Sequence, residues 1–260
     1  LKTPYSGLFD ARRNHFNQFK MNTTQLIIHN LGQLWETAGK ASDGFKKGDG
    51  YFVSMAENGE WPNRIWATET LSEETMADID SEMKTFKQIM FSHFNETETE
   101  TTLLKEHGFE LKSEQYGMSL QLSSKFEVEK TMELERVSSS ENAKLWSQAF
   151  YDAFQYDISS DTIVHAMKDI PFFLVKNEEA LVGTLILFAT GKVLGIHSLG
   201  IRPTQRKKGY AKEIMHYVLN NAIEKGYAQA TLQASEMAKN MYVQMGFTFD
   251  FMMKNYKLKQ

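Results

Sequence analysis

One stretch, residues 194–211, constrains the fold more than any other part of the chain. It reads LGIHSLGIRPTQRKKGYA. Residues 194–201 are apolar and rich in β-forming types, and Pro203 ends that run because proline cannot donate a ladder hydrogen bond. After a basic loop, apolar residues recur at the spacing of one buried helix face: Ala211, Ile214, Met215, Val218, Leu219, Ala222 and Ile223. The stretch therefore predicts a strand, a loop and a helix, in that order.

The loop has the composition of an anion-binding site. Arg206, Lys207 and Lys208 lead into Gly209, where the first backbone N–H groups of the helix have no partner within it. These free donors and the helix dipole both favour a phosphate group. The loop is not a nucleotide P-loop, because no Gly-Lys-Ser/Thr follows the strand. Its glycine spacing also differs from the dinucleotide fingerprint. The competing interpretation is an ordinary basic turn between a strand and a helix.

Two segments resemble the GNAT superfamily of N-acetyltransferases. LGIRPTQRKKGYA, residues 199–211, is similar to the acetyl-CoA signature of that family. AKNMYVQMGF, residues 238–247, looks like its closing helix and strand. The resemblance extends over about residues 134–260 and implies a mixed, strongly twisted sheet flanked by helices.

The resemblance implies acetyl-CoA as the cofactor and indicates which residues would hold it. Backbone groups around Leu199, Gly200 and Ile201 would pair with the pantetheine arm. Ser235 stands where the family often has an asparagine that touches the cofactor, a departure from the family pattern. The pyrophosphate would lie on the loop and first helical turn formed by Arg206, Lys207, Lys208, Gly209, Tyr210 and Ala211.

The resemblance also implies direct transfer of the acetyl group to an amine, without an acyl-enzyme. Tyr242 aligns with a tyrosine that in many relatives lies near the departing thiolate and acts as an acid. Many relatives carry a glutamate base where this chain has Gly195. His197 lies on the same strand face, and the unperturbed pKa of histidine suits proton removal near neutrality. The strand of arylalkylamine N-acetyltransferases bears a working histidine at the matching place. The base is therefore predicted to be His197, with a water chain as the alternative.

An internal repeat predicts a second, degenerate copy of the fold. Gly108-Phe109 echoes Gly246-Phe247, and the two glycines are 138 residues apart, as are Leu120 and Leu258. We therefore expect two GNAT-like domains of the α/β (α+β) class, each a mixed twisted sheet flanked by helices. The expected bounds are an arm at 1–21, a degenerate domain at 22–125 and an acetyltransferase domain at 126–260. Chance similarity at two helix–strand junctions is the alternative.

Other elements follow from local patterns. Asn58-Gly59 predicts a hairpin turn between strands at 51–55 and 65–67, and residues 86–91 read as a strand. Each Gly-Phe pair is expected to open two strands joined by a turn. An acceptor pocket is expected between the helix around 146–154 and the sheet. Its predicted aromatic residues are Phe150, Tyr151, Phe154 and Tyr156, and Asp152 and Asp157 would attract a cationic amine.

Composition limits the partners. The net charge of −4 gives no general attraction to nucleic acid or to an anionic membrane. The chain has no cysteine, so it has no thiolate metal site and no cysteine nucleophile; we expect no metal. No apolar run reaches the roughly 20 residues of a membrane span, and no signal-type segment begins the sequence, so we expect a cytoplasmic protein. The expected acceptor is a small-molecule amine, and the alternative function is a non-catalytic module that binds or senses CoA.

Overall fold

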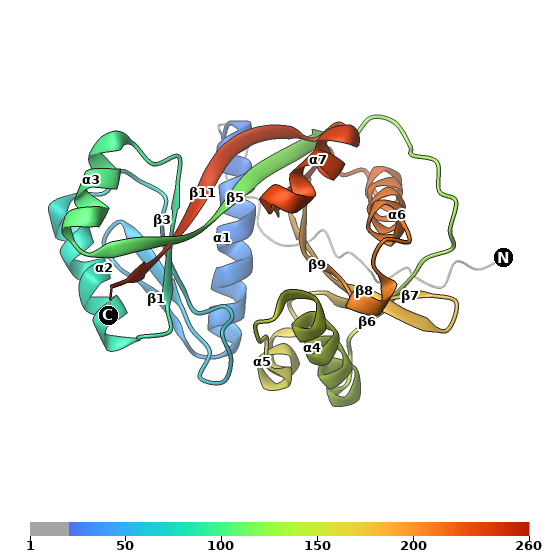
Figure 1. The fold of residues 1–260 in the computed structure, drawn as a ribbon, viewed down its shortest axis with the longest axis horizontal. Coiled ribbons are helices and arrows are strands. Elements are labelled where there is room, and N and C mark those ends of the chain that lie inside the picture. The colour runs from blue at the N-terminus through green and yellow to red at the C-terminus, as the bar shows by residue number, and fades with distance from the viewer. Residues whose placement is uncertain (1–20, 260) are drawn as a thin grey trace.

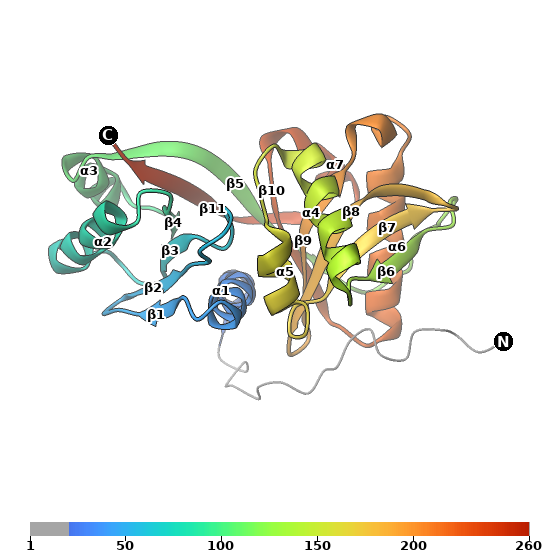
Figure 2. The ribbon, with the colours of Figure 1, turned by 90° about the horizontal axis from the view of Figure 1, so that it is seen from below.

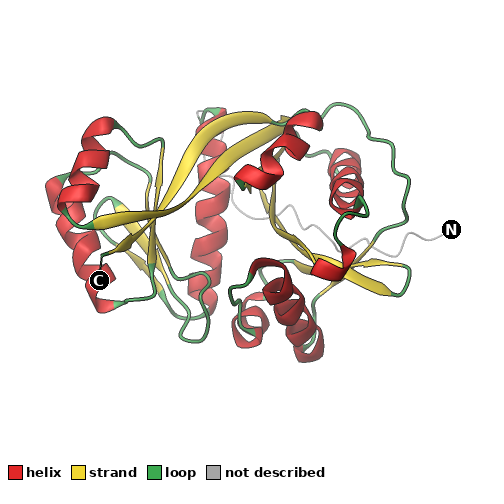
Figure 3. Ribbon diagram, viewed as in Figure 1, coloured by secondary structure: helices red, strands yellow, loops and turns green. Residues whose placement is uncertain are grey.

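The computed structural model describes residues 21–259, so the arm predicted for residues 1–21 lies outside the described residues apart from Met21. The first half of the chain holds α1 (Thr23–Ala41), β1 (Phe45–Lys47), β2 (Tyr51–Ser54), β3 (Arg64–Ala67), α2 (Glu73–Thr85), β4 (Met90–Phe94), α3 (Glu98–Glu106) and β5 (Phe109–Gln121). The second half holds β6 (Glu133–Arg136), α4 (Ser140–Phe154), α5 (Ser160–Ala166), β7 (Phe172–Asn177), β8 (Ala180–Thr190), β9 (Val193–Ile201), a 3-10 turn (Pro203–Gln205), α6 (Tyr210–Glu224), β10 (Gln229–Ala234), α7 (Glu236–Gln244) and β11 (Thr248–Leu258). The expected mixed α/β class is confirmed (Figures 1 and 3).

All the described strands belong to one eleven-stranded sheet in the order β1-β2-β3-β4-β11-β5-β10-β9-β8-β7-β6. The pairs β3–β4 and β9–β10 are parallel, and the other pairs are antiparallel. Each parallel pair is joined through a helix, α2 in the first half and α6 in the second, as a parallel connection requires.

The long strands β5 and β11 pair side by side and run from one half of the molecule to the other (Figure 1). β11, from the second half, lies between β4 and β5 of the first half. β5 in turn lies between β11 and β10. The predicted pair of strands after each glycine is therefore wrong: each segment is one long strand. β11 bends through register shifts between Phe249 and Phe251 and between Asn255 and Tyr256, and such bulges take the place of the expected turn.

Two further local predictions are corrected. β2 and β3 do pair antiparallel, but residues 55–63 join them, so Asn58-Gly59 is part of a longer loop and not a tight hairpin. The strand expected at 86–91 begins at Met90, because Phe86 instead ends α2 by donating its N–H to Glu82. Helix α2 therefore extends to Thr85, and the apolar residues that follow it do not begin a strand until Met90.

The order strand, helix, strand, helix, strand occurs twice, as β3-α2-β4-α3-β5 and as β9-α6-β10-α7-β11. Helices α3 and α7 end at Glu106 and Gln244. Gly108 and Gly246 both follow with positive φ, 76° and 93°. The left-handed geometry explains why both positions are glycine. A division into two domains near residue 125 stays a prediction, because one sheet runs through both halves.

Three groups of buried side chains fill the space around the sheet. One joins α6 and α7 to β8, β9 and β10, the second joins α1, α4 and α5 to the opposite face, and the third covers α2 and α3 in the first half. Helix α1 lies at the junction, against β2 on one side and α5, β8 and β9 on the other (Figure 2). None of the described helices is both long enough and apolar enough to cross a membrane.

Candidate active site

The sheet opens between β9 and β10. Their parallel pairing ends at Gly195 opposite Thr231. Beyond that point β10 continues its pairing with β5, up to Ala234 opposite Tyr116, while β9 runs on to Ile201. Residues 196–201 therefore have no strand partner on this side, and their backbone groups line the opening.

A bulge in β9 sets which backbone groups face this opening. The β8–β9 register shifts between Thr184 and Ile186, and Ser198 has a φ of 52°. Thr184 Oγ1 fixes the bulge by donating to the Ser198 carbonyl at 3.1 Å. The Arg202 N–H donates to Val182 of β8. Because backbone direction alternates along a strand, the N–H and C=O groups of Leu199 and Ile201 face away from β8, into the opening.

The loop after β9 ends in a helix start without a side-chain cap. Gly209 is the N-cap of α6, with a φ of 81°, and no side chain caps the first turn. Lys207 is also left-handed, with a φ of 62°. Successive N–H groups in such alternating conformations form a concave donor surface for an anion. Tyr210, in the first turn, donates its hydroxyl to Asn177 at 3.0 Å, which fixes the helix end to β7.

The predicted basic residues of this loop do not all point to the same place. The Arg206 guanidinium donates to the carbonyls of Ile201, at 3.2 Å, and Ala153, at 2.8 Å. It therefore joins the end of β9 to the end of α4. Lys208 donates to Gln205 at 2.9 Å. Arg206 thus shapes the loop, whereas the exposed lysines and the free N–H groups of α6 remain as groups for an anion.

A cavity of about 200 Å³ lies beside the opening of the sheet. Its lining brings together several predicted residues that are far apart in the sequence. From the second half it includes His197, Ser198, Leu199, Gln233, Ser235 and Tyr242. From the first half it includes Leu34, Trp35, Trp61, Arg64 and Gln115. Gly200 and the loop residues 206–211 are outside this lining, further along the opening.

His197 is buried in this cavity wall, and both ring nitrogens have partners. Nε2 lies 3.1 Å from Asn30 Oδ1, and Nδ1 lies 3.2 Å from the Gln233 amide. Burial lowers the pKa of His197 to about 4. The imidazole is therefore neutral near pH 7, which makes it a weak base there.

Asn30 determines the tautomer of His197. The Asn30 Nδ2 donates to the Phe188 carbonyl and to Thr190 Oγ1, both at 3.0 Å, so Oδ1 is the atom left for the histidine. Nε2 must then carry the proton, and Nδ1 is the acceptor. The Gln233 Nε2 is buried without a partner when Gln233 Oε1 faces Nδ1. Rotating that amide by half a turn lets its N–H donate to Nδ1 and satisfies both groups.

Gly195 leaves the space that this pair occupies. A Cβ at position 195 would lie 2.0 Å from Asn30 Oδ1 and 2.3 Å from His197 Nε2. No side chain fits there while the two residues are hydrogen-bonded. The place at which the family resemblance led us to look for a glutamate base is thus filled by a neutral Asn30–His197 pair.

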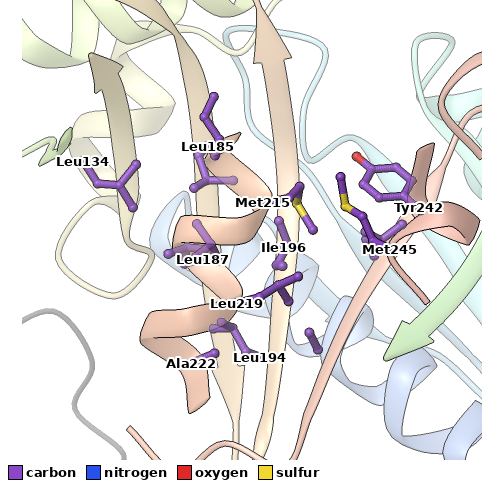
Figure 4. Packing of buried hydrophobic residues seen from close by; sticks show 14 of the residues in the cluster. Leu134, Leu185, Leu187, Leu194, Ile196, Met215, Leu219, Ala222, Tyr242 and Met245 are labelled. Atoms are coloured by element: carbon purple, nitrogen blue, oxygen red, sulfur yellow. The ribbon is translucent and has the colours of Figure 1, made fainter. Parts of the chain in front are cut away.

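Tyr242 lies on α7 and lines the same cavity as His197. Its ring packs among buried residues that include Met245 and Ile196 (Figure 4). Burial raises the pKa of its phenol to about 12, so the hydroxyl is protonated at neutral pH. This hydroxyl makes no hydrogen bond with another described residue, and Tyr242 lines the cavity. It can therefore donate a hydrogen bond to a ligand.

The residues predicted for the acceptor pocket divide into two groups. Phe154 and Tyr156 line the cavity. Phe150 is fully buried beside Trp146, and Tyr151 is 46% exposed. Asp152 forms an ion pair with Arg202 at 3.2 Å, and the Asp157 carboxylate accepts a long hydrogen bond from Ser147 at 3.5 Å. Neither aspartate is part of the cavity lining, which contains no carboxylate among the described residues.

Sequence patterns did not indicate Asn30 or Arg64, which the first half contributes to the site. Arg64 follows the loop 55–63 and lies at the start of β3. Asn30 lies on α1, which otherwise reads as an ordinary amphipathic helix. Neither residue belongs to a motif, so only an alignment or the fold itself could have identified them.

Comparison with known proteins agrees with this geometry. Residues 131–247 match the model of the acetyltransferase (GNAT) family. A GCN5-related N-acetyltransferase from Kribbella flavida superposes with a TM-score of 0.64 at 16% identity, over 90% of this chain and 95% of that one. One from Sphaerobacter thermophilus gives a TM-score of 0.58 at 12% identity, over 80% of this chain and 76% of that one.

A putative GNAT acetyltransferase from Novosphingobium aromaticivorans gives a TM-score of 0.58 at 9% identity, over 87% of this chain and 96% of that one. No curated protein matches the sequence. At these identities the structures show that the chain has a GNAT-like fold along most of its length, and they leave its substrate open.

Proposed function

We propose that this protein is an acetyl-CoA-dependent N-acetyltransferase that moves an acetyl group directly to a small primary amine. The observation that carries the proposal is the opening between β9 and β10. It leads from the cavity to the uncapped start of α6 at Gly209. An elongated cofactor with a thioester at one end and phosphates at the other fits this arrangement. The family match over residues 131–247 supports the same function.

The chain's own groups fit the binding of such a cofactor. The backbone groups of Leu199 and the N–H of Ile201 can pair with the amide groups of the pantetheine arm, as an added strand would, while the Ile201 carbonyl accepts from Arg206. The free N–H groups of α6 and the exposed Lys207 and Lys208 favour the pyrophosphate. Ser235, the N-cap of α7, makes no capping hydrogen bond, so its hydroxyl is available to the cofactor.

We propose three steps for the transfer of the acetyl group. Bound acetyl-CoA would supply a thioester to a neutral amine: the C–N bond would form, the nitrogen would lose a proton to water, and the C–S bond would break to release the CoA thiolate. A backbone N–H at the β9 bulge would stabilise the developing oxyanion. The Tyr242 hydroxyl would donate a hydrogen bond to the departing thiolate. Because the phenol pKa is about 12, Tyr242 stabilises the thiolate chiefly as a hydrogen-bond donor.

The proton acceptor is the part of the mechanism for which two candidates were open. Both nitrogens of His197 are engaged and its pKa is lowered to about 4, so we propose that a water chain removes the proton. His197 then acts as a positioning residue. It ties α1 to the opening through Asn30 and orients Gln233 in the cavity wall.

The first test is calorimetric titration of acetyl-CoA into the wild type, Gly209→Glu and Gly226→Glu. Both glycines are left-handed, with φ of 81° and 74°, and a Cβ at either one meets no close neighbour. The two substitutions therefore cost similar backbone strain, but only Gly209 lies at the proposed pyrophosphate site. We expect saturable binding to the wild type and Gly226→Glu, and at least a tenfold loss in Gly209→Glu.

Absence of binding to the wild type would overturn the cofactor assignment. Equal loss in both variants would mean that the loop acts only through the stability of α6. The alternative function, a non-catalytic CoA-binding module, would be favoured by tight acetyl-CoA binding without turnover of any primary amine. The uncommitted hydroxyl of Tyr242 in the cavity favours the enzyme.

A further inference from the structure

Arg64 is a guanidinium in the cavity wall that has no carboxylate partner among the described residues. Its Nη1 donates to two neutral oxygens, Ser92 Oγ at 2.9 Å and Asn255 Oδ1 at 2.7 Å. Its Nε is buried and makes no hydrogen bond. The Trp35 ring lies 5.2 Å from its Cζ, a cation–π contact that orients the group without neutralising it.

This arrangement is costly for folding alone. Burial lowers the pKa of Arg64 to about 10, so the side chain still carries its charge near neutrality. Arg64 is partly buried. A charge taken out of water without a counter-ion destabilises a fold, and such charges in proteins are accordingly paired. The neutral Ser92–Asn255 pair fixes the position of the guanidinium and leaves its charge uncompensated. The counter-ion is therefore expected to come from a ligand.

We propose that Arg64 binds a carboxylate of the acceptor, so that the acceptor is a small amino acid rather than a simple amine. This inference rests on the proposed function and names the substrate class of the same cavity. The Nη2 of Arg64 is the terminal guanidinium nitrogen that donates neither to Ser92 nor to Asn255, and a charge-assisted hydrogen bond from it suits a carboxylate. The aromatic walls formed by Trp35, Trp61 and Phe154 suit an apolar side chain.

The size and charge of the cavity agree with this substrate class. Pockets for drug-sized ligands occupy about 300–1,000 Å³, so about 200 Å³ suits a smaller molecule. The predicted attraction of a cationic amine to Asp152 and Asp157 is not available in the cavity, since neither lines it.

The experiment compares amino acids with the amines that lack their carboxylate. The pairs are glycine with methylamine, leucine with 3-methylbutylamine, and phenylalanine with phenethylamine. Acetyl transfer is measured for the wild type, Arg64→Met, Arg64→Lys and the control Arg136→Met. Arg136 is also partly buried and hydrogen-bonded to a backbone carbonyl, but it lies on β6 at the far edge of the sheet.

We expect kcat/KM of the wild type to be at least tenfold higher for an amino acid than for its partner amine. Arg64→Met should lower the value for the amino acid at least thirtyfold, mainly through KM, and change the value for the amine less than threefold. For the amino acid, kcat/KM of Arg64→Lys should fall between those of the wild type and Arg64→Met, because lysine keeps the charge but not the planar guanidinium donor. Arg136→Met should behave as the wild type. Equal use of amines and amino acids, or an equal loss for both in Arg64→Met, would overturn the inference.

A second measurement is independent of catalysis. Leucine is titrated into the ¹⁵N-labelled wild type, and the Nε–H resonance of Arg64 is identified from its absence in Arg64→Met or Arg64→Lys. A saturable shift of this resonance with leucine, and none with 3-methylbutylamine, supports carboxylate binding. No shift would contradict it, whether or not any acceptor is turned over. Failure of the proposed function is recognised separately, by absence of acetyl-CoA binding in calorimetry.

Discussion

His197 lines the cavity, and its pKa lies well below that of a free imidazole. Its buried ring is held between Asn30 and Gln233, and its pKa is lowered from 6.5 to about 4. Between these two pH values the unfolded chain binds a proton that the folded chain does not. The stability linked to His197 is therefore fully present above pH 6.5 and is lost progressively as the pH falls towards 4.

This linkage gives a measurable pH dependence. We expect the wild type to lose about 2 kcal/mol of unfolding free energy between pH 7 and pH 5 through His197 alone. In His197→Gln that share of the loss should disappear. Urea unfolding of both proteins at the two pH values measures the difference. A decrease of the same size in both proteins would contradict the lowered pKa. Any decrease common to both belongs to other groups, such as the buried His93, whose pKa burial also lowers.

At this scale the sequence indicated some site residues and not others. His197 and Tyr242 belong to motifs, and the structure places both in the cavity lining. Their assigned catalytic roles stay predictions. Asn30 could not be found because its role depends on a contact with a residue 167 positions away. Arg64 looks like any strand residue until the fold shows that its partners are neutral.

At the scale of the elements, the close packing of α1 against β9 depends on a glycine, Gly195, in β9. Gly195 allows Asn30 to approach His197, and a Cβ there would overlap both side chains. The close contact between α1 and the second half therefore relies on a position at which residue size, not backbone conformation, requires glycine.

Gly195→Ala should lower the unfolding free energy by about 2–3 kcal/mol, because it displaces the hydrogen-bonded pair. Asn30→Ala removes one of the two overlapping groups. In the Asn30→Ala background we therefore expect Gly195→Ala to cost less than it costs in the wild type. A double-mutant cycle by urea unfolding measures this coupling. Strictly additive effects would show that the predicted overlap is relieved in another way.

The elements that could be predicted share a strong local signal. The helix predicted from the periodic apolar face of 211–223 and the strand predicted at 194–201 lie close to the observed bounds of α6 and β9. Element errors arose where the geometry depends on neighbours. β5 and β11 were each expected as two strands, because a bend inside a long paired strand has no local signature.

At the scale of the whole molecule, β5 and β11 join the halves. β5 fills the position between β10 and β11, and β11 fills the position between β4 and β5. Each half therefore supplies a strand that completes the sheet of the other. Helix α1 adds the contact through Asn30. The halves are thus expected to depend on each other for stability, even if their repeated element order reflects duplication.

A fragment of residues 126–260 tests this dependence. It contains every residue of the family match but lacks β5 and α1. We expect the fragment to show no cooperative urea transition by circular dichroism, whereas residues 22–260 should unfold in one transition with the same midpoint by circular dichroism and fluorescence. A fragment that unfolds cooperatively and binds acetyl-CoA would establish the second half as an independent domain.

The position of β11 also has a consequence for how the chain is made. β11 is synthesised after the other ten described strands, yet it lies in the interior of the sheet, with β4 on one side and β5 on the other. On a ribosome, β4 and β5 are exposed long before their shared neighbour emerges. The nascent chain must therefore keep a gap between two finished strands until β11 has emerged. Premature termination even a few residues upstream of Thr248 would leave that gap unfilled, with two edges free to pair with another chain.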